Sequence, residues 1–218
     1  MFHIITKYRF FFIFIKLFLY CLLKAINAQL GWFHQTGIIL AVLITSSVLI
    51  IGHQEKFLVR AILSIIAIAI IFNLVEIFFD TKIIHILRLL LIIGFFILMN
   101  YYCLLFTARD KTISVTTLFG SISSYLFIGL IFAYIYLLIE LISPNSFVGL
   151  QATNEVRAIY FSFITLTTVG YGDITAVKPI AQTFTWFESF SGQLYLAVII
   201  GQLVGRYAAE QQLNKVNN

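Results

Sequence analysis

The chain of 218 residues is 61% hydrophobic and only 11% charged, which excludes an ordinary soluble domain, whose apolar share is about one half. The composition predicts an integral membrane protein. Only two prolines interrupt the chain, and the apolar runs do not alternate with polar residues, so we expect long helices and not a barrel. The formal net charge of +5 comes from basic residues scattered between apolar runs, which indicates topology signals and no nucleic-acid partner.

Six apolar segments are long enough to span a membrane as helices, which takes about 20 residues each. They lie at residues 10–30, 36–52, 57–79, 83–106, 118–142 and 180–206. The first segment carries Lys16 and Lys24, and it either spans the membrane or lies flat in the interface. Six spans put most basic residues between the segments on the side of both termini, which the positive-inside rule assigns to the cytoplasm. The two lysines are then expected to snorkel toward opposite faces.

The segment between the last two spans is too polar to cross at its start and then leads into "TLTTVGYGD" at residues 165–173. Backbone that is not helical is tolerated at membrane depth only where protein buries it or where it lines a water-filled path. We therefore predict a re-entrant loop. Gly170 and Gly172 adopt positive φ easily, and residues of alternating handedness turn successive carbonyl groups to the same side.

The predicted product is a column of oxygen atoms suited to a partly dehydrated alkali cation. Its metal ligands are the carbonyl groups of Thr168, Val169, Gly170 and Tyr171, with the hydroxyl of Thr168 as a further oxygen. One chain supplies only one wall of such a cage. We therefore expect a homotetramer that holds such cations on its axis and needs no organic cofactor.

The stretch "TTVGYGD", between an aromatic-rich helix and an apolar helix, resembles the pore domain of potassium channels over residues 118–206. The N-terminal part is similar, more loosely, to that of small bacterial six-span channels without a cytoplasmic sensor domain. The resemblance implies an all-α integral membrane protein with six transmembrane helices. It further implies a re-entrant pore helix and filter loop between the last two helices, and a homotetramer around a central pore in the lipid bilayer of the bacterial inner membrane.

Three parts follow along the chain. Residues 1–117 are expected to form a four-span membrane domain, which is a degenerate voltage sensor, a lipid-facing collar or a docking site. Residues 118–206 are expected to form the pore domain. Residues 207–218 are expected to be a short cytoplasmic tail, too short for a soluble ligand-binding domain.

By position, residues 156–167 match the pore helix of the family, whose carboxyl end favours a cation in the cavity. The resemblance implies a selectivity filter made of Thr168, Val169, Gly170, Tyr171, Gly172 and Asp173. Support of the filter is expected from Thr165, Thr167, Tyr160, Phe161 and Glu188.

Two of these positions differ from those in relatives. Tyr160 and Phe161 match an aromatic pair that packs behind the filter, where relatives often carry tryptophan. In some relatives a glutamate of the pore helix pairs with the aspartate that matches Asp173, but Ile164 stands at that position here. We therefore do not expect inactivation through such a carboxyl pair.

The last span contains a carboxylate and a glycine of interest. Gly192 matches the hinge glycine of the family's inner helix, and the alternative is that it serves close helix packing. Glu188 stands among aromatic residues, where a charge is costly unless it is paired. Our hypothesis is that Glu188 bonds to Ser162 or Thr165 of the pore helix, or to a neighbouring inner helix. The alternative is that it is protonated or lies near the outer interface.

The sequence predicts a passive potassium-selective channel and not an enzyme, because it contains no metal-ligand spacing, nucleophile elbow or phosphate loop. Lys82, His85 and Arg88 form too short a ladder for steep gating, so we expect weak voltage dependence or none. Three alternatives stay open: a less selective or voltage-gated cation channel, a pore-loop subunit of a cation transporter, and a non-conducting interaction protein built on the first four spans. The gating stimulus is not indicated.

Overall fold

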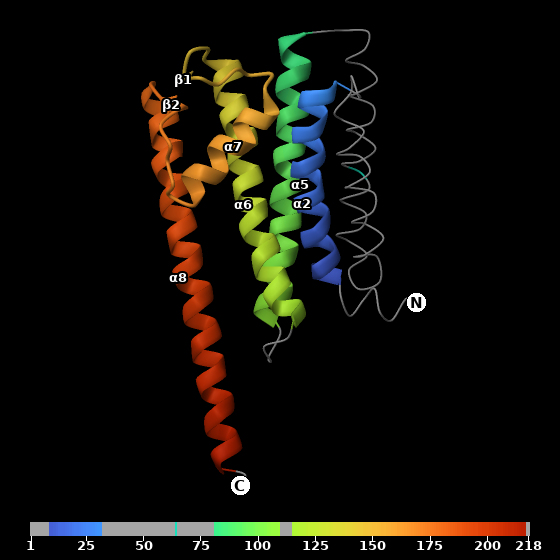
Figure 1. Ribbon diagram of the computed structural model, residues 1–218, viewed down its shortest axis with the longest axis vertical. Helices are drawn as coiled ribbons and strands as arrows, with labels where there is room; N and C mark the ends of the chain where they lie inside the picture. Colours follow the sequence, from blue (N-terminus) through green and yellow to red (C-terminus); the bar gives the residue numbers. More distant parts are fainter. Residues whose placement is uncertain (1–8, 32–63, 65–80, 110–114, 217–218) are drawn as a thin grey trace.

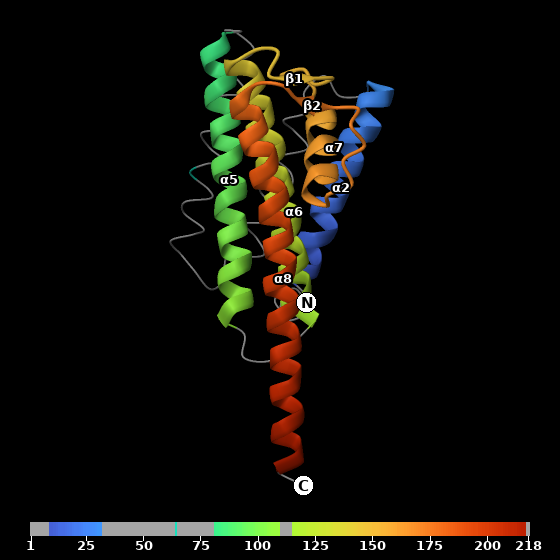
Figure 2. The same cartoon turned by 90° about the vertical axis from the view of Figure 1, so that its left-hand side faces the viewer.

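The computed structural model describes residues 9–31, 64, 81–109 and 115–216. Within these residues the chain is almost entirely helical, with four long helices side by side and one short helix packed against three of them (Figures 1 and 2). The helices are α2 (Arg9–Leu30), α5 (Lys82–Arg109), α6 (Val115–Ile142), the short α7 (Glu155–Leu166) and α8 (Pro179–Val216).

Three of the described helices are long and apolar enough to cross a membrane. Their spanning parts are Phe10–Leu30, Lys82–Leu105 and Thr117–Ile142, which correspond to the first, fourth and fifth predicted spans. The predicted spans at 36–52 and 57–79 lie outside the described residues, so the count of six stays a prediction. The first segment, α2, contacts α6 and runs along the bundle with the other long helices in Figure 1, and not across it.

The long helices alternate in direction. In Figure 1, α2 and α6 rise toward the end at which α7 lies, whereas α5 and α8 descend from it. Helix α8 corresponds to the sixth predicted span and continues as one helix to Val216, beyond the predicted span end at residue 206. It therefore projects past the other helices at the opposite end of the bundle (Figure 1).

Helix α6 forms the centre of the bundle and contacts α2, α5, α7 and α8. It is apolar on all sides, which is the pattern of a helix buried by several neighbours. Phe127, Leu130 and Ala133 have no exposed surface at all. Near the α7 end, the rings of Tyr136, Phe147 and Phe161 pack in pairs with centroids 5.0–5.6 Å apart. This aromatic cluster fixes α7 against α6.

Lys24 differs from the sequence expectation. Instead of snorkelling, its side chain is 3% exposed and forms an ion pair with Glu155 at the start of α7. A buried ammonium group needs a partner because the loss of water is costly for a charge. Lys16, which lies two turns earlier on α2, is half-buried.

The chain reverses direction after α6 around a buried carboxylate, Glu140, which is 7% exposed. The backbone amides of Asn145, Ser146 and Phe147 donate to its two oxygens at 2.7, 2.9 and 3.1 Å. The strand that begins at this turn, β1 (Phe147–Val148), pairs antiparallel with β2 (Thr175–Ala176), which follows the filter. Glu140 therefore fixes the start of the loop at residues 143–154, which is called the outer loop below. The β1–β2 pair closes the two ends of the segment that contains α7 and the predicted filter. The sequence predicted neither strand.

Glu140→Ala is expected to destabilise the fold, because three backbone amides lose their acceptor. Each buried donor left without a partner costs about 1–3 kcal/mol. Glu140→Gln retains one carbonyl oxygen and should lie between the alanine variant and the wild type. Thermal unfolding of the detergent-solubilised protein, followed by intrinsic fluorescence, measures the difference. An alanine variant as stable as the wild type would contradict this account of the turn.

Candidate ion-conduction site

Helix α7 presents its carboxyl end to the site. It begins at Glu155 after the cap Asn154, whose side chain accepts the amide of Arg157 at 3.0 Å. It ends at Leu166, one residue from the predicted end, and Thr167 is its C-cap. In Figure 1, α7 descends from the outer loops and stops partway along α6 and α8. The negative end of its dipole therefore lies inside the bundle.

The backbone after α7 alternates in handedness. Thr168, Gly170 and Gly172 have φ of 61°, 50° and 80°, whereas Val169 and Tyr171 between them are not at positive φ. The sequence predicted this alternation for the two glycines, and the structure begins it two residues earlier, at Thr168. Thr168 is a β-branched residue for which a left-handed conformation costs roughly 1–3 kcal/mol, so the surrounding bonds must impose it.

Those bonds come from α7. Three amides donate to carbonyl oxygens of its last turn: Thr168 to Thr165 at 2.9 Å, Val169 to Ile164 at 2.8 Å and Gly170 to Ile164 at 3.1 Å. In a trans peptide the C=O and N–H groups point in opposite directions, and none of the described peptides is cis. The carbonyl groups of Thr167, Thr168 and Val169 therefore point away from α7. The hydroxyl of Thr168 donates to the carbonyl of Thr167 at 2.7 Å.

The outer end of the segment is held through Asp173. The hydroxyl of Tyr160 donates to Asp173 Oδ1 at 3.1 Å, and Arg157 Nη2 lies 4.0 Å from Oδ2. Arg157 Nε also donates to the carbonyl of Gly149 at 2.7 Å, which ties the residue to the outer loop. Arg157 and Asp173 are nearly half-exposed, so their attraction is weak. Sequence analysis did not single out Arg157.

Phe161, the other member of the aromatic pair, is buried in the cluster with Tyr136 and Phe147. It therefore packs against α6 and the outer loop, whereas Tyr160 faces Asp173. Thr165 and Thr167 also occupy the turn that carries the filter. The hydroxyl of Thr167 donates to the carbonyl of Phe163 at 2.6 Å, and the carbonyl of Thr165 accepts from the filter.

Glu188 has no exposed surface and lies between α6 and α7. The hydroxyl of Tyr136 donates to Glu188 Oε2, and Ser162 Oγ lies 2.5 Å from Oε1. Of the two pore-helix partners considered from the sequence, the structure brings Ser162 to the carboxyl group. Thr165 instead accepts a bond from Ser189 at its carbonyl, at 3.1 Å. Tyr136, 52 positions away in the sequence, was not anticipated.

A count of protons bears on the state of this carboxyl group. Ser162 Oγ lies 2.6 Å from the carbonyl oxygen of Gly129 as well as 2.5 Å from Glu188 Oε1, but a hydroxyl carries one proton. Both contacts are satisfied when Glu188 is the neutral acid and donates to Ser162, which donates to Gly129. The protonated alternative from the sequence is therefore the one that fits the bonds.

Gly192 lies where α8 touches the end of α7. A Cβ atom at this position would be 2.4 Å from the carbonyl oxygen of Leu166 and 2.9 Å from its side chain. Only glycine permits this approach. The geometry favours the packing alternative for Gly192, while the hinge stays a prediction, because α8 is one continuous helix across this position.

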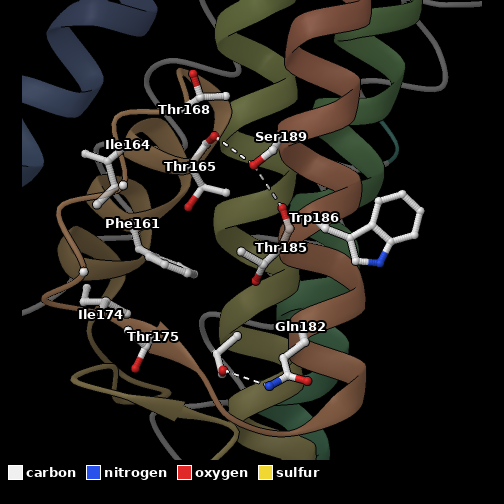
Figure 3. Close-up of a pocket in the computed structure, with 13 residues that line it drawn as sticks. Phe161, Ile164, Thr165, Thr168, Ile174, Thr175, Gln182, Thr185, Trp186 and Ser189 are labelled. Atoms are coloured by element: carbon white, nitrogen blue, oxygen red, sulfur yellow. Dashed lines mark hydrogen bonds between the residues drawn. The ribbon is translucent and has the colours of Figure 1, made fainter.

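A pocket lies behind the filter, between α7 and the first half of α8 (Figure 3). On its wall the hydroxyl of Ser189 lies 3.1 Å from the carbonyl oxygen of Thr165 and 3.3 Å from that of Thr185, and the Trp186 side chain points away from the pore helix. Val169 and Tyr171 of the filter are 53% and 73% exposed. Within the described ranges no group of three His, Cys, Asp or Glu residues is placed to hold a metal ion. Among the described residues, the main-chain oxygens that follow α7 are the candidate cation ligands.

Comparison with known proteins gives two matches for this region. Residues 121–208 match a protein family described as "Ion channel". The inward rectifier potassium channel Kirbac3.1 of Paramagnetospirillum magnetotacticum is 33% identical to this chain over 87 residues. The matched segment makes up 38% of this chain and 27% of that channel. No solved structure matches the chain.

Glu188→Gln is expected to preserve conduction, because a glutamine amide donates to Ser162 and accepts from Tyr136 as the neutral acid does. Glu188→Ala removes both partners and leaves a cavity, and a drop of about 2–4 kcal/mol in the free energy of unfolding is expected. Thermal unfolding and potassium flux measured on the same preparations test both statements. A glutamine variant as damaged as the alanine variant would argue for an ionised Glu188.

Gly192→Ala is expected to force α8 and the end of α7 apart. Overpacking of this kind costs about 1–3 kcal/mol, and thermal unfolding measures it. Gly201→Ala is the matched control, because its Cβ atom meets nothing within 4 Å in the chain and alanine favours a helix. If Gly192→Ala left stability intact and changed only channel opening, the hinge interpretation would stand and the packing interpretation would fall.

Proposed function

We propose that residues 121–208, which match an ion-channel family and resemble part of a potassium channel, form a potassium pore. The chain then conducts K+ passively as one subunit of a homotetramer. The observation that carries the proposal is the filter backbone. Positive φ recurs at Thr168, Gly170 and Gly172, and the amides of Thr168, Val169 and Gly170 donate to α7. The carbonyl groups of the same peptides point away from α7 and are left for an ion, and rings of such oxygens replace the water shell of K+.

The uncovered surfaces of one chain support a tetramer. The filter side chains Val169 and Tyr171 are more than half exposed in the single chain, and α8 also carries exposed apolar side chains. The exposed apolar residues of α8 are Ile180, Trp186, Phe187, Phe190, Leu194, Leu196, Val198 and Ile200. Four copies around an axis cover the filter side chains and place four carbonyl groups at each level, whereas one copy encloses no ion.

Weak voltage dependence is part of the proposal. Lys82, His85 and Arg88 lie in the first two turns of α5, at the α7 end of the bundle (Figure 1). Lys82 is exposed, and the other two are half-buried. Two fixed charges near one end of a helix cross little of the membrane field, and steep gating takes three or four crossing charges per subunit.

The membrane arrangement is also a proposal. We assign residues 1–117 to a four-span domain, 118–206 to the pore and 207–218 to a tail. With six spans, both termini lie in the cytoplasm, and the bacterial inner membrane is the location. The directions of α2, α5, α6 and α8 in Figure 1 support this assignment. The start of α2 and the end of α8 both lie at the end of the bundle that is opposite α7.

Ion flux into liposomes that contain the purified protein tests the function. We expect K+ uptake that barium blocks, little Na+ uptake, and a weak dependence on voltage in planar bilayers. Gly170→Ala should abolish selective flux, because φ at this position is 50° and a side chain there costs about 1–2 kcal/mol in each subunit. Gly201→Ala is the same chemical change at a helical position, where the added Cβ atom meets nothing within 4 Å in its own chain, and this variant should conduct.

Native mass determination in lipid tests the assembly, with four chains expected. Equal uptake of Na+ and K+ would favour the alternative of a less selective cation channel. A monomer would favour a pore-loop subunit of a larger transporter, and a tetramer without flux would favour a non-conducting interaction protein.

A further inference from the structure

A buried charge links the first helix to the pore helix. Lys24 is 3% exposed on α2, and its ammonium group pairs with Oε2 of Glu155, whose side chain is 14% exposed. The two residues are 131 positions apart in the chain. Because α2 and α7 contact one another at this end of the bundle, the ion pair fastens two elements that the chain itself does not join closely. A charge removed from water is tolerated only with such a partner.

Two tyrosines complete the arrangement. Tyr134 of α6 donates to Glu155 Oε2 at 3.1 Å, and its hydroxyl lies 2.5 Å from that of Tyr20 on α2. The ammonium group of Lys24 lies 5.7 Å from the centre of the Tyr20 ring, within the range of a cation–π contact. A single carboxylate thus joins α2, α6 and α7. Hydrogen bonds are directional, so this cluster fixes where α7 begins more tightly than apolar contacts would.

The other end of α7 carries the filter. Glu155 is the first residue of the helix, and the carbonyls of Ile164 and Thr165 on its last turns accept the filter amides. The helix has 12 residues, which makes a rod roughly 18 Å long. A rod this short does not bend easily, so a displacement at Glu155 tilts the carbonyl groups that shape the filter.

We propose that α2 is a positioning element of the selectivity filter, acting through the Lys24–Glu155 pair and the length of α7. This inference rests on the proposed channel function and gives the first helix a role in the pore, distinct from a lipid-facing collar. Lys24 and Glu155 touch no ion. They act by holding the pore helix at the angle at which its carbonyl groups meet the filter amides.

A charge-removal cycle tests the proposal. Lys24→Met and Glu155→Gln each strand one buried charge, whereas the double variant removes both. We expect each single variant to raise sodium permeability relative to potassium, or to lower the open probability, by roughly tenfold, which corresponds to about 1.4 kcal/mol. The double variant should lie closer to the wild type than either single variant. Lys16→Met, the same change at a half-buried lysine of the same helix, should leave both quantities unchanged.

Thermal unfolding of the same variants separates positioning from bulk stability. Variants that unfold earlier but keep the permeability ratio and open probability of the wild type would overturn the proposal, as would a double variant that sums the damage of the two singles. Lys24→Arg and Glu155→Asp retain the charges and serve where a single variant does not fold. These two variants are expected to keep the permeability ratio and the open probability near the wild-type values, as Lys16→Met does. A tenfold loss in both variants, without coupling between them, would overturn the proposed role of the pair.

Failure of the proposed function looks different. In that case liposomes that contain the wild-type protein show no barium-sensitive potassium flux. The proposed positioning role of α2 is then overturned together with the proposed channel function. The coupling between Lys24→Met and Glu155→Gln in thermal unfolding still decides, in that case, whether the pair holds α2 against α7.

Discussion

The first three amides of the predicted filter depend on the last turn of α7 for their hydrogen-bond acceptors, and the other supports of the proposed pore act through that helix. Backbone that leaves the helical form inside a membrane must find partners within the protein. Here the carbonyls of Ile164 and Thr165 supply them. Helix α6 reaches the same turn through Tyr125, whose hydroxyl donates to the carbonyl of Leu166 at 3.2 Å, and α8 reaches it through Ser189. Position and orientation of one short helix therefore decide the shape of the filter.

Polar side chains fix that helix within an otherwise apolar bundle. Contacts between apolar side chains have no preferred direction. Helices held by such contacts alone can therefore slide or rotate against each other at little cost in free energy. Glu155 at the start of α7, Ser162 in its middle and the carbonyl of Thr165 near its end each bond to a neighbouring long helix. The three contacts lie along the length of the helix, and together they leave it little freedom to translate or tilt. Their burial makes each contact costly to break.

The sequence predicted the elements far better than their pairings. The resemblance to the channel family located α7 to within one residue, and the two glycines themselves indicated positive φ at Gly170 and Gly172, because these features depend on a continuous stretch of the chain. The partners of Lys24 and Glu188 depend on which helix faces which, and an apolar segment carries no local signal of that. A lysine near the end of a span fits either snorkelling or an ion pair by composition alone. The left-handed Thr168 was missed because side-chain preference opposes it, and tertiary bonds override preference.

The two ends of the filter are supported by different physics. At its inner end, main-chain amides bond to main-chain carbonyls, including that of Ile164, whose side chain replaces the carboxyl group of some relatives. At its outer end, Asp173 is held by the hydroxyl of Tyr160 and by a long, half-exposed contact with Arg157. Surface charge pairs are weak and screened by salt, whereas buried main-chain bonds are neither. The rigidity of the filter should therefore decrease outward, from the carbonyls nearest α7 to the carboxylate at the mouth.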